Sequence, residues 1–186
     1  MLYFKTIEYT GEPPKIVLPN GLYRNPLVAS GDIPVTDLNV FEFFACYKFC
    51  NPGNKHNLPQ IELASNGITE QTTFIGESVN IYNFLDAMRA NSRDAKAKVF
   101  KIFFSDCGEH LSVIVSDDGE GLSLDQKFRD ALFTYGNTTR FDRVGCSLAW
   151  GKVQLQRITG DIKYKGVGVD GKGASFEMSF LKKMPM

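Results

Sequence analysis

Two stretches of the chain carry apolar residues at helical spacing. In the first, four apolar side chains recur at positions i, i+3, i+4 and i+7: Val40, Phe43, Phe44 and Tyr47. This spacing places them on one side of an α-helix. We expect this helix over residues 38–50, with Asp37 as its N-cap. The same spacing predicts a second amphipathic helix over residues 77–95.

The second half of the chain changes to runs typical of β-strands. Residues 99–104 and 111–116 are rich in strand-forming side chains and flank a short Cys-Gly-Glu turn, so we expect an antiparallel hairpin. Two closing strands are predicted at 162–164 and 174–180, on either side of a glycine-rich turn. Residues 2–9 also alternate and predict a strand near the start of the chain.

Two more helices complete the predicted order. They are expected over residues 123–135, with a serine as cap, and over residues 146–158, with a polar loop at 136–144 between them. The order of elements predicts an α+β fold, a two-layer sandwich with helices on one face of a mixed sheet. We therefore divide the chain into a β-rich N-terminal extension, 1–36, and one domain, 37–186.

The composition limits the cellular environments and binding partners that are expected for this protein. Lys plus Arg equals Asp plus Glu at 21 each in 186 residues, so no global field favours nucleic acid or an anionic membrane. No run of about 18 apolar residues predicts a membrane helix, and the N-terminus does not resemble a signal peptide, so we expect a cytoplasmic protein. The four cysteines show no C-x-x-C pair and are interpreted as reduced thiols: Cys46, Cys50, Cys107 and Cys146. Cys46 and Cys50 are spaced to supply two metal ligands from one helix, but neither histidine has zinc-like spacing to them, so these two are interpreted as buried small side chains.

Three glycine-containing segments are the main candidates for chemistry. They are 117–121 (Asp-Asp-Gly-Glu-Gly), 144–149 (Val-Gly-Cys-Ser-Leu-Ala) and 171–176 (Gly-Lys-Gly-Ala-Ser-Phe). Each alone indicates no more than a turn. Together with the helix at 77–95, their order and spacing resemble the GHKL superfamily of ATP-binding domains, over roughly residues 77–180. That superfamily includes gyrase B, the ninety-kilodalton heat-shock chaperones, histidine kinases, MutL-type repair proteins and MORC ATPases. The resemblance implies a Bergerat-type fold with a largely antiparallel sheet.

The resemblance assigns the base and cation ends of a nucleotide site. Asp117 takes the place of the aspartate that accepts a hydrogen bond from the adenine amino group, while Gly119 and Gly121 would let the backbone approach the base. Asn91 takes the place of the asparagine that coordinates Mg²⁺ between the phosphates. Asp94 is assigned to the same site. The alternative is that Asn91 and Asp94 only end their helix.

The resemblance also assigns the phosphate end. Thr138, Thr139 and Arg140 lie where family members carry a lid segment, and their side chains would donate to phosphate oxygens. An exposed polar loop is the alternative at these positions. Gly145 and Ser147 fall in the glycine-rich segment whose amides and helix N-terminus receive phosphates.

Departures from the family pattern bear on activity. Ala87 stands where several branches place the general-base Glu, and the adjacent Asp86 is turned by about 100° around the helix, so it does not replace that base. Ser147 replaces a second glycine of the phosphate segment, and Ala174 replaces a threonine near the adenine. His56 is the only histidine upstream of the resembling region, residues 77–180. It falls in an expected loop rather than on the helix that the histidine kinase branch uses for its phosphoacceptor, which disfavours autophosphorylation in cis.

The sequence therefore predicts a domain that binds ATP or ADP with Mg²⁺, with weak or no hydrolysis, and that acts as a regulatory or partner-binding module. The partner is expected to be another protein, and pairing of the first strand across an edge would allow a homodimer. Two alternatives stay open. The first is an active ATPase or a protein kinase acting in trans, and the second is a scaffold that no longer binds nucleotide.

Overall fold

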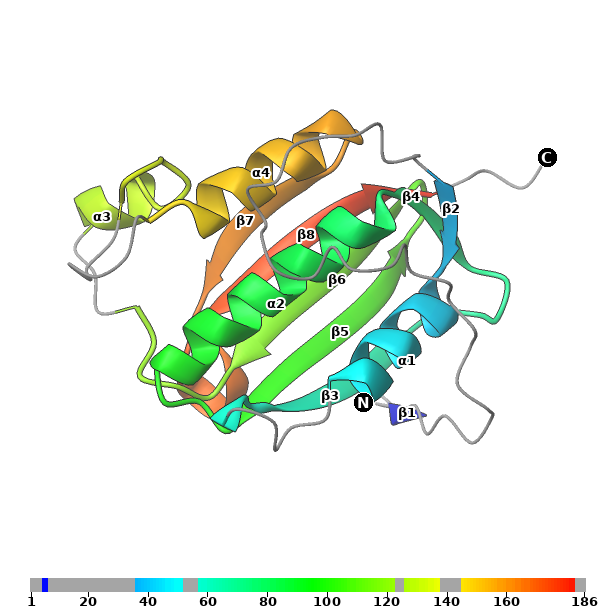
Figure 1. The fold of residues 1–186 in the computed structure, drawn as a ribbon. Helices are drawn as coiled ribbons and strands as arrows, with labels where there is room; N and C mark the ends of the chain where they lie inside the picture. The colour runs from blue at the N-terminus through cyan, green and yellow to red at the C-terminus, as the bar shows by residue number, and fades with distance from the viewer. Residues whose placement is uncertain (1–4, 7–35, 52–56, 123–125, 138–144, 183–186) are drawn as a thin grey trace.

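Helices and sheet form two layers in the computed structural model, which describes residues 5–6, 36–51, 57–122, 126–137 and 145–182 (Figure 1). The larger sheet has six strands: β1 (Lys5–Thr6), β3 (Gln60–Asn66), β5 (Val99–Cys107), β6 (His110–Asp117), β7 (Asp161–Gly166) and β8 (Ser175–Leu181). A second sheet has two strands: β2 (Thr36–Asn39) and β4 (Thr73–Gly76).

The larger sheet is mixed and mostly antiparallel. Its strands follow the order β1-β3-β5-β6-β8-β7, in which only β3 and β5 run parallel. Parallel neighbours need a crossover connection, and the chain between β3 and β5 includes helix α2 (Ser78–Asp94). The hairpin of β5 and β6 pairs Ile102 with Val115, and β6 pairs Val113 with Met178 of β8. The predicted fold class is confirmed.

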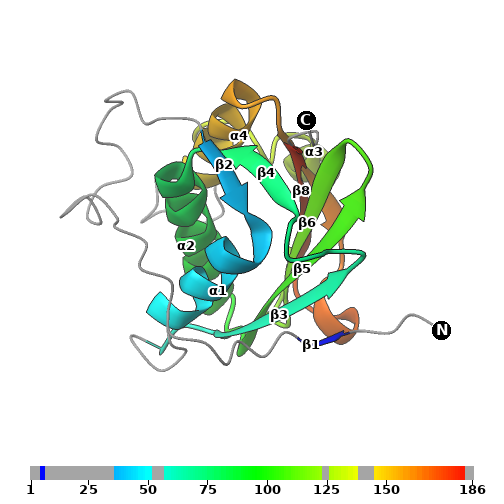
Figure 2. The ribbon, with the colours of Figure 1, turned by 90° about the vertical axis from the view of Figure 1, so that its right-hand side faces the viewer.

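Three helices cover one face of this sheet. They are α1 (Val40–Cys50), α2 and α4 (Ser147–Arg157), and in Figure 2 they lie on one side of the larger sheet. The short helix α3 (Gln126–Asp130) lies beyond the end of α4, and a 3₁₀ turn, η2 (Val169–Gly171), lies between β7 and β8. Among the described residues, no helix has the length and apolar character needed to span a membrane.

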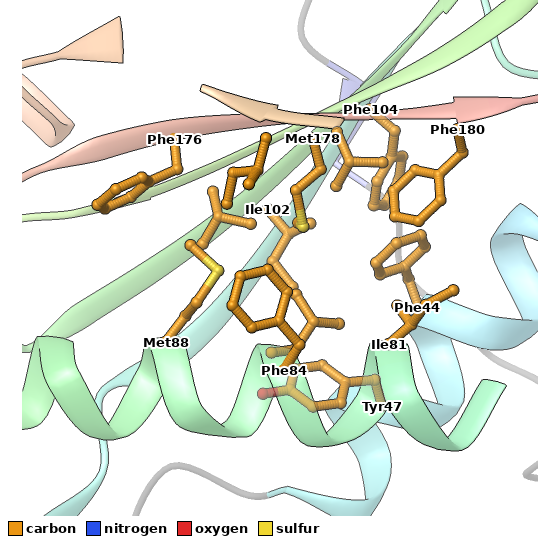
Figure 3. Packing of buried hydrophobic residues seen from close by; sticks show 14 of the residues in the cluster. Phe44, Tyr47, Ile81, Phe84, Met88, Ile102, Phe104, Phe176, Met178 and Phe180 are labelled. Carbon is orange, nitrogen blue, oxygen red and sulfur yellow. The ribbon is translucent and has the colours of Figure 1, made fainter. Parts of the chain in front are cut away.

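The core lies between the helices and the sheet (Figure 3). Phe84 and Met88 of α2 point toward Ile102 and Met178 of the sheet, and all four side chains are buried. An aromatic cluster extends the core at the α1 end. The ring centroids of Phe44 and Phe104 are 4.8 Å apart, and those of Phe74 and Phe180 are 5.0 Å apart. Burying one such side chain contributes roughly 1.5 to 3 kcal/mol. The apolar side chains that predicted helices α1 and α2 therefore face the sheet.

The first helix begins later than predicted. Asn39, not Asp37, is its N-cap, and its side-chain oxygen accepts a hydrogen bond from the Glu42 amide at 3.1 Å. The Asn39 side-chain nitrogen also donates to the carbonyl oxygen of Glu70 at 2.7 Å. Asp37 lies in β2, where it pairs with Ile75. Pairing with β4 keeps Asp37 extended and shifts the cap by two residues.

The third predicted helix is much shorter in the structure. It ends at Asp130 rather than at residue 135, and the predicted start at residues 123–125 lies outside the described residues. The side-chain amide of Asn137 donates to the carbonyl oxygens of Phe128 and Ala131, at 3.3 and 2.9 Å. These bonds satisfy carbonyls that a continuing helix would otherwise use.

Strands β3 and β4 were not predicted, although β3 carries a readable signal. Ile61 and Leu63 are buried and alternate with exposed Gln60 and Glu62, which is strand periodicity. Only residues 5–6 of the predicted strand 2–9 are described, and they pair antiparallel with β3 of the same chain. The described part of that strand therefore pairs with another strand of the same chain.

The burial predicted for Cys46 and Cys50 is confirmed for Cys46 and wrong for Cys50. Cys46 is buried, but Cys50 and Cys107 are exposed and Cys146 is half-buried. Cys50 follows Cys46 by one helical turn and is the last residue of α1, beyond Tyr47, the last buried residue of that helix. His56 falls outside the described residues.

Candidate functional site

Asp117 is a buried carboxylate at the end of β6. Its side chain is surrounded by hydrogen-bond donors: Oδ1 accepts from the amides of Gly119 at 2.9 Å and Ala174 at 3.3 Å, and Oδ2 accepts from the hydroxyl of Ser92 at 2.9 Å. The residue is only 7% exposed. These bonds compensate the burial of its charge. Asp117 thus joins α2, its own turn and the start of β8.

The glycines near Asp117 are required by close contacts within the chain. A Cβ on Gly173 would lie 2.0 Å from the carbonyl oxygen of Asp117, and one on Gly168 would lie 2.2 Å from the same atom. A Cβ on Gly119 would lie 2.6 Å from the carbonyl oxygen of Ala95. All three distances are too short for any side chain. The backbone therefore packs closely around Asp117.

Gly121 has a related role. Its φ of +74° lies in the left-handed region, and a Cβ there would lie 2.8 Å from the carbonyl oxygen of Gly173. The sequence predicts that Gly119 and Gly121 leave room for a base. The structure gives a second reason for both glycines, because a side chain at either position would collide with the backbone around Asp117.

Helix α2 links Asp117 to the start of α4. Ser92 is buried and contacts Asp117, while Asn91, the preceding residue, is exposed and donates from Nδ2 to the hydroxyl of Ser147 at 3.4 Å. Ser147 is the first residue of α4. Two consecutive residues of α2 therefore connect the predicted base end and the predicted phosphate end of the site.

Asp94 lies at the end of α2, where it is bonded to its neighbour. Its Oδ1 accepts from Nε and Nη2 of Arg93, at 3.0 and 2.9 Å. The side chain of Asp94 is 13% exposed. The next turn is tied to the Asp117 segment, because the Glu120 amide donates to the carbonyl oxygen of Ala95 at 2.8 Å. Asp94 is the last residue of α2, and its assignment to a nucleotide remains a prediction.

Asp86 lies on a different side of α2 from Asn91. It interacts with Tyr47 of α1 and with Arg89, whose guanidinium is fully buried and donates to the carbonyl oxygen of Pro59. Burial raises the pKa of Asp86, and the Tyr47 hydroxyl and the Arg89 charge oppose that change. This placement agrees with the prediction that Asp86 does not substitute for a base at position 87.

Ala87 belongs to the side of α2 that packs against α4. On this side Asn80 donates to Gln154 at 3.2 Å, and Phe84 packs against Gly151. Because residues three and four apart share a face of a helix, Ala87 lies between Phe84 and Asn91 on the α4 side. No carboxylate occupies that position.

Gly145 precedes α4 at a tight junction. Its φ is +66°, and a Cβ there would lie 2.9 Å from the carbonyl carbon and oxygen of Asn137. The Gly136 amide donates to the carbonyl oxygen of Gly145 at 3.1 Å. The predicted phosphate contacts at Thr138, Thr139 and Arg140 lie outside the described residues. At the helix start itself, Cys146 occupies the N-cap position without a side-chain capping bond.

Sequence reasoning missed Ser92 and Gly168 as parts of this arrangement. Ser92 is a buried hydroxyl on a helix whose neighbouring buried residues include Met88 and Arg89. A hydroxyl in such a position needs a partner, which is the signal that would have selected it. Gly168 lies in a run with several glycines, and its contact with Asp117 depends on the sheet.

Comparison with known protein families and with curated protein sequences found no match. Solved structures do match, over most of the chain. The ATP-binding domain of PrrB from Mycobacterium tuberculosis is 12% identical, with a TM-score of 0.59 over 81% of this chain and 98% of that one. The catalytic domain of the histidine kinase ThkA is 17% identical, with a TM-score of 0.65 over 82% of this chain and 99% of that one.

A third match is to full-length ShkA, solved in complex with AMPPNP. It is 17% identical, with a TM-score of 0.62, and the match covers 84% of this chain and 33% of ShkA. These matches share one fold, a mixed sheet with helices on one face, which is the fold of the ATP-binding domain of histidine kinases. The chain has this fold, and the fold predicted from the resemblance is confirmed.

Proposed function

We propose that the chain binds an adenine nucleotide, ATP or ADP, together with Mg²⁺. The proposal rests on one observation above all, the joining of Asp117, Ser92 and Asn91 in one continuous set of contacts that reaches Ser147 at the start of α4. The base would lie at Asp117 and the phosphates beside Asn91 and Ser147. The ShkA structure, with its bound AMPPNP, supports this proposal by its likeness in fold.

The residues present suit a magnesium ion. Asn91 is exposed and carries a neutral amide oxygen, and Mg²⁺ binds through few protein oxygens while phosphates and waters complete its shell. Asn91 would hold the ion, and the ion would offset the phosphate charge. Within the described residues, no group of three or more His, Cys, Asp and Glu side chains gathers as a metal site. A site shared with phosphate oxygens therefore fits this chain better than an all-protein site.

We propose further that the domain hydrolyses its nucleotide weakly or not at all. General bases need a titratable group within reach of the attacking water. Position 87 carries a methyl group, and the neighbouring Asp86 interacts with Tyr47 and Arg89 toward α1. A domain that binds ATP or ADP without rapid turnover is suited to a regulatory or partner-binding role, in which the bound nucleotide changes affinity for another protein.

Calorimetry on the full chain tests the binding proposal. ATP and ADP are titrated in Mg²⁺ into the wild type, Asp117→Asn and Glu120→Gln. Asp117→Asn should weaken binding by about tenfold or more, because an amide replaces a charged acceptor. Glu120→Gln is the matched control, since Glu120 belongs to the same turn but pairs with Lys96 on the surface, and it should leave binding unchanged. A folded wild type that takes up neither nucleotide would contradict the proposal.

Phosphate release measured on the same preparations separates binding from catalysis. The proposal expects binding with turnover close to the background. Steady turnover that Asn91→Ala abolishes would instead establish an active ATPase. Absence of both binding and turnover would leave the scaffold alternative.

A further inference from the structure

We infer that Ser92 is a positioning residue for base selection: its hydroxyl holds Asp117 so that the carboxylate keeps one acceptor position for a single N–H of the base. This inference deepens the proposed function and rests on it. Ser92 itself need not touch the nucleotide.

The Ser92 hydroxyl has one proton and two acceptors within reach. It lies 2.9 Å from Oδ2 of Asp117 and 3.1 Å from the carbonyl oxygen of Met88. In an α-helix the Met88 carbonyl already accepts from the backbone amide of Ser92. The carboxylate is charged and nearer, and charge-assisted hydrogen bonds are the stronger ones. The proton therefore belongs mainly to the bond with Asp117.

Counting the acceptor positions of Asp117 shows what remains. An ionised carboxylate offers about four lone-pair positions. Oδ1 uses two, for the amides of Gly119 and Ala174, and Oδ2 uses one for Ser92. Within the part of the chain that the structure describes, no other donor bonds to Oδ2, so one position on it is left for a ligand. All three protein partners are donors, so this last position accepts a hydrogen bond and cannot donate one.

The fixed orientation of Asp117 is what turns this count into selectivity. Without Ser92, the Oδ2 side would have two open positions and no bond from α2 to hold it. The carboxylate would then be able to accept water at either position. With Ser92 in place, a base with an amino group at this position donates a hydrogen bond to Oδ2. A base with a carbonyl oxygen there places an oxygen lone pair against that of Oδ2, which is repulsive.

The chain offers a closely matched control outside the site. Ser112 of β6 is also a buried serine, 6% exposed against 5% for Ser92. Its hydroxyl also donates to a carboxylate, Oε1 of Glu177 at 2.8 Å. Loss of either hydroxyl removes the same kind of bond, so a general effect on folding would follow from both substitutions.

The experiment measures dissociation constants of ATP and of inosine triphosphate, which has a carbonyl in place of the adenine amine, by calorimetry in Mg²⁺. The proteins are the full chain as wild type, Ser92→Ala, Ser92→Thr and Ser112→Ala. The wild type should prefer ATP by about tenfold or more, as one lost hydrogen bond to a charged group predicts. Ser92→Ala should weaken ATP by about fivefold and inosine triphosphate by less than about twofold, so the preference falls.

Ser92→Thr keeps the hydroxyl and should keep the preference, and Ser112→Ala should change neither constant. Equal losses for both nucleotides in Ser92→Ala, or no loss, would overturn the inference and leave the proposed function standing. A wild type that binds both nucleotides equally would overturn it without any variant, should Ser92→Ala fail to fold. A wild type that binds neither refutes the proposed function itself.

Discussion

Gly151 of α4 packs directly against the ring of Phe84 of α2. A Cβ on Gly151 would lie 2.0 Å from Cε2 of Phe84 and 2.3 Å from two further ring atoms. Gly is a poor helix former, so its presence inside α4 is explained by this contact. The two helices that carry the proposed phosphate end therefore approach each other at a point where only hydrogen fits.

Gly151→Ala is expected to destabilise the domain, although alanine favours helices. The added methyl overlaps the ring of Phe84, and overpacking of this kind costs about 1 to 3 kcal/mol. Denaturant unfolding measures the change. Phe84→Leu in the Gly151→Ala background removes ring atoms and should recover part of the loss, whereas Val153→Ala on the exposed side of α4 should cost little. An unfolding free energy equal to that of the wild type would contradict this, because it would show that α2 and α4 make room for the methyl group without loss of stability.

Asn91→Ala should weaken nucleotide binding in Mg²⁺ by about tenfold, a change of about 1.4 kcal/mol, and should have little effect in EDTA. The reason is that its proposed role runs through the ion. Asn80→Ala is the matched control, because Asn80 is an asparagine on the same helix that contacts Gln154 instead. Equal losses with and without the ion would remove Asn91 from the cation site.

Ala87→Glu tests whether the absent base explains low turnover. The new carboxylate would lie one turn before Asn91 on the α4 side of the helix. Positioned general bases contribute about 10² to 10⁴-fold in rate, and we expect the lower end or less, because Ser147 and Ala174 remain. Phosphate release and ATP calorimetry are measured together. A variant that binds ATP yet stays as inactive as the wild type would place the defect elsewhere in the site.

Asp118 should contribute to the pH dependence of stability. It accepts from the amides of Lys98 and Val99, at 2.8 and 2.9 Å. Burial alone would raise the pKa of Asp118, but these backbone hydrogen bonds outweigh it and lower the pKa. A lowered pKa in the folded state gives stability that is present above the ordinary Asp value of about 3.9 and is lost as the pH falls through the folded value.

Asp118→Asn should therefore lower the free energy of unfolding near pH 7, and its difference from the wild type should shrink below about pH 4. Urea unfolding from pH 7 to pH 2.5 measures this difference. Asp170→Asn, an exposed aspartate in η2, serves as the comparison and should follow the wild type throughout. A constant difference between wild type and Asp118→Asn across the range would show that the charge of Asp118 is immaterial.

Strong periodicity made the main elements predictable. Helix α2 was expected over residues 77–95 and spans Ser78–Asp94, and α4 was expected over 146–158 and spans Ser147–Arg157. Helix α2 was predicted from its apolar spacing, and α4 from its start and stop signals. The β5–β6 hairpin was predictable for a similar reason, since its two runs flank a short turn.

The remaining features depend on contacts between distant parts of the chain. Choosing Asn39 over Asp37 as the cap requires the pairing of Asp37 with Ile75, which no local pattern contains. Within the candidate site, Asp117 and Asn91 were selected from the sequence. Ser92 was not, because its partner Asp117 is reached only once α2 has packed over β6.

The adjacency of Asn91 and Ser92 limits how this site changes by mutation. A point substitution at either residue removes one contact and leaves the other in place. Deleting a single residue earlier in α2 turns both side chains by about 100° around the helix axis and shifts them by about 1.5 Å. Both contacts are then lost in one event. A one-residue deletion within the first part of α2 is therefore expected to cost the site more than a substitution at either Asn91 or Ser92.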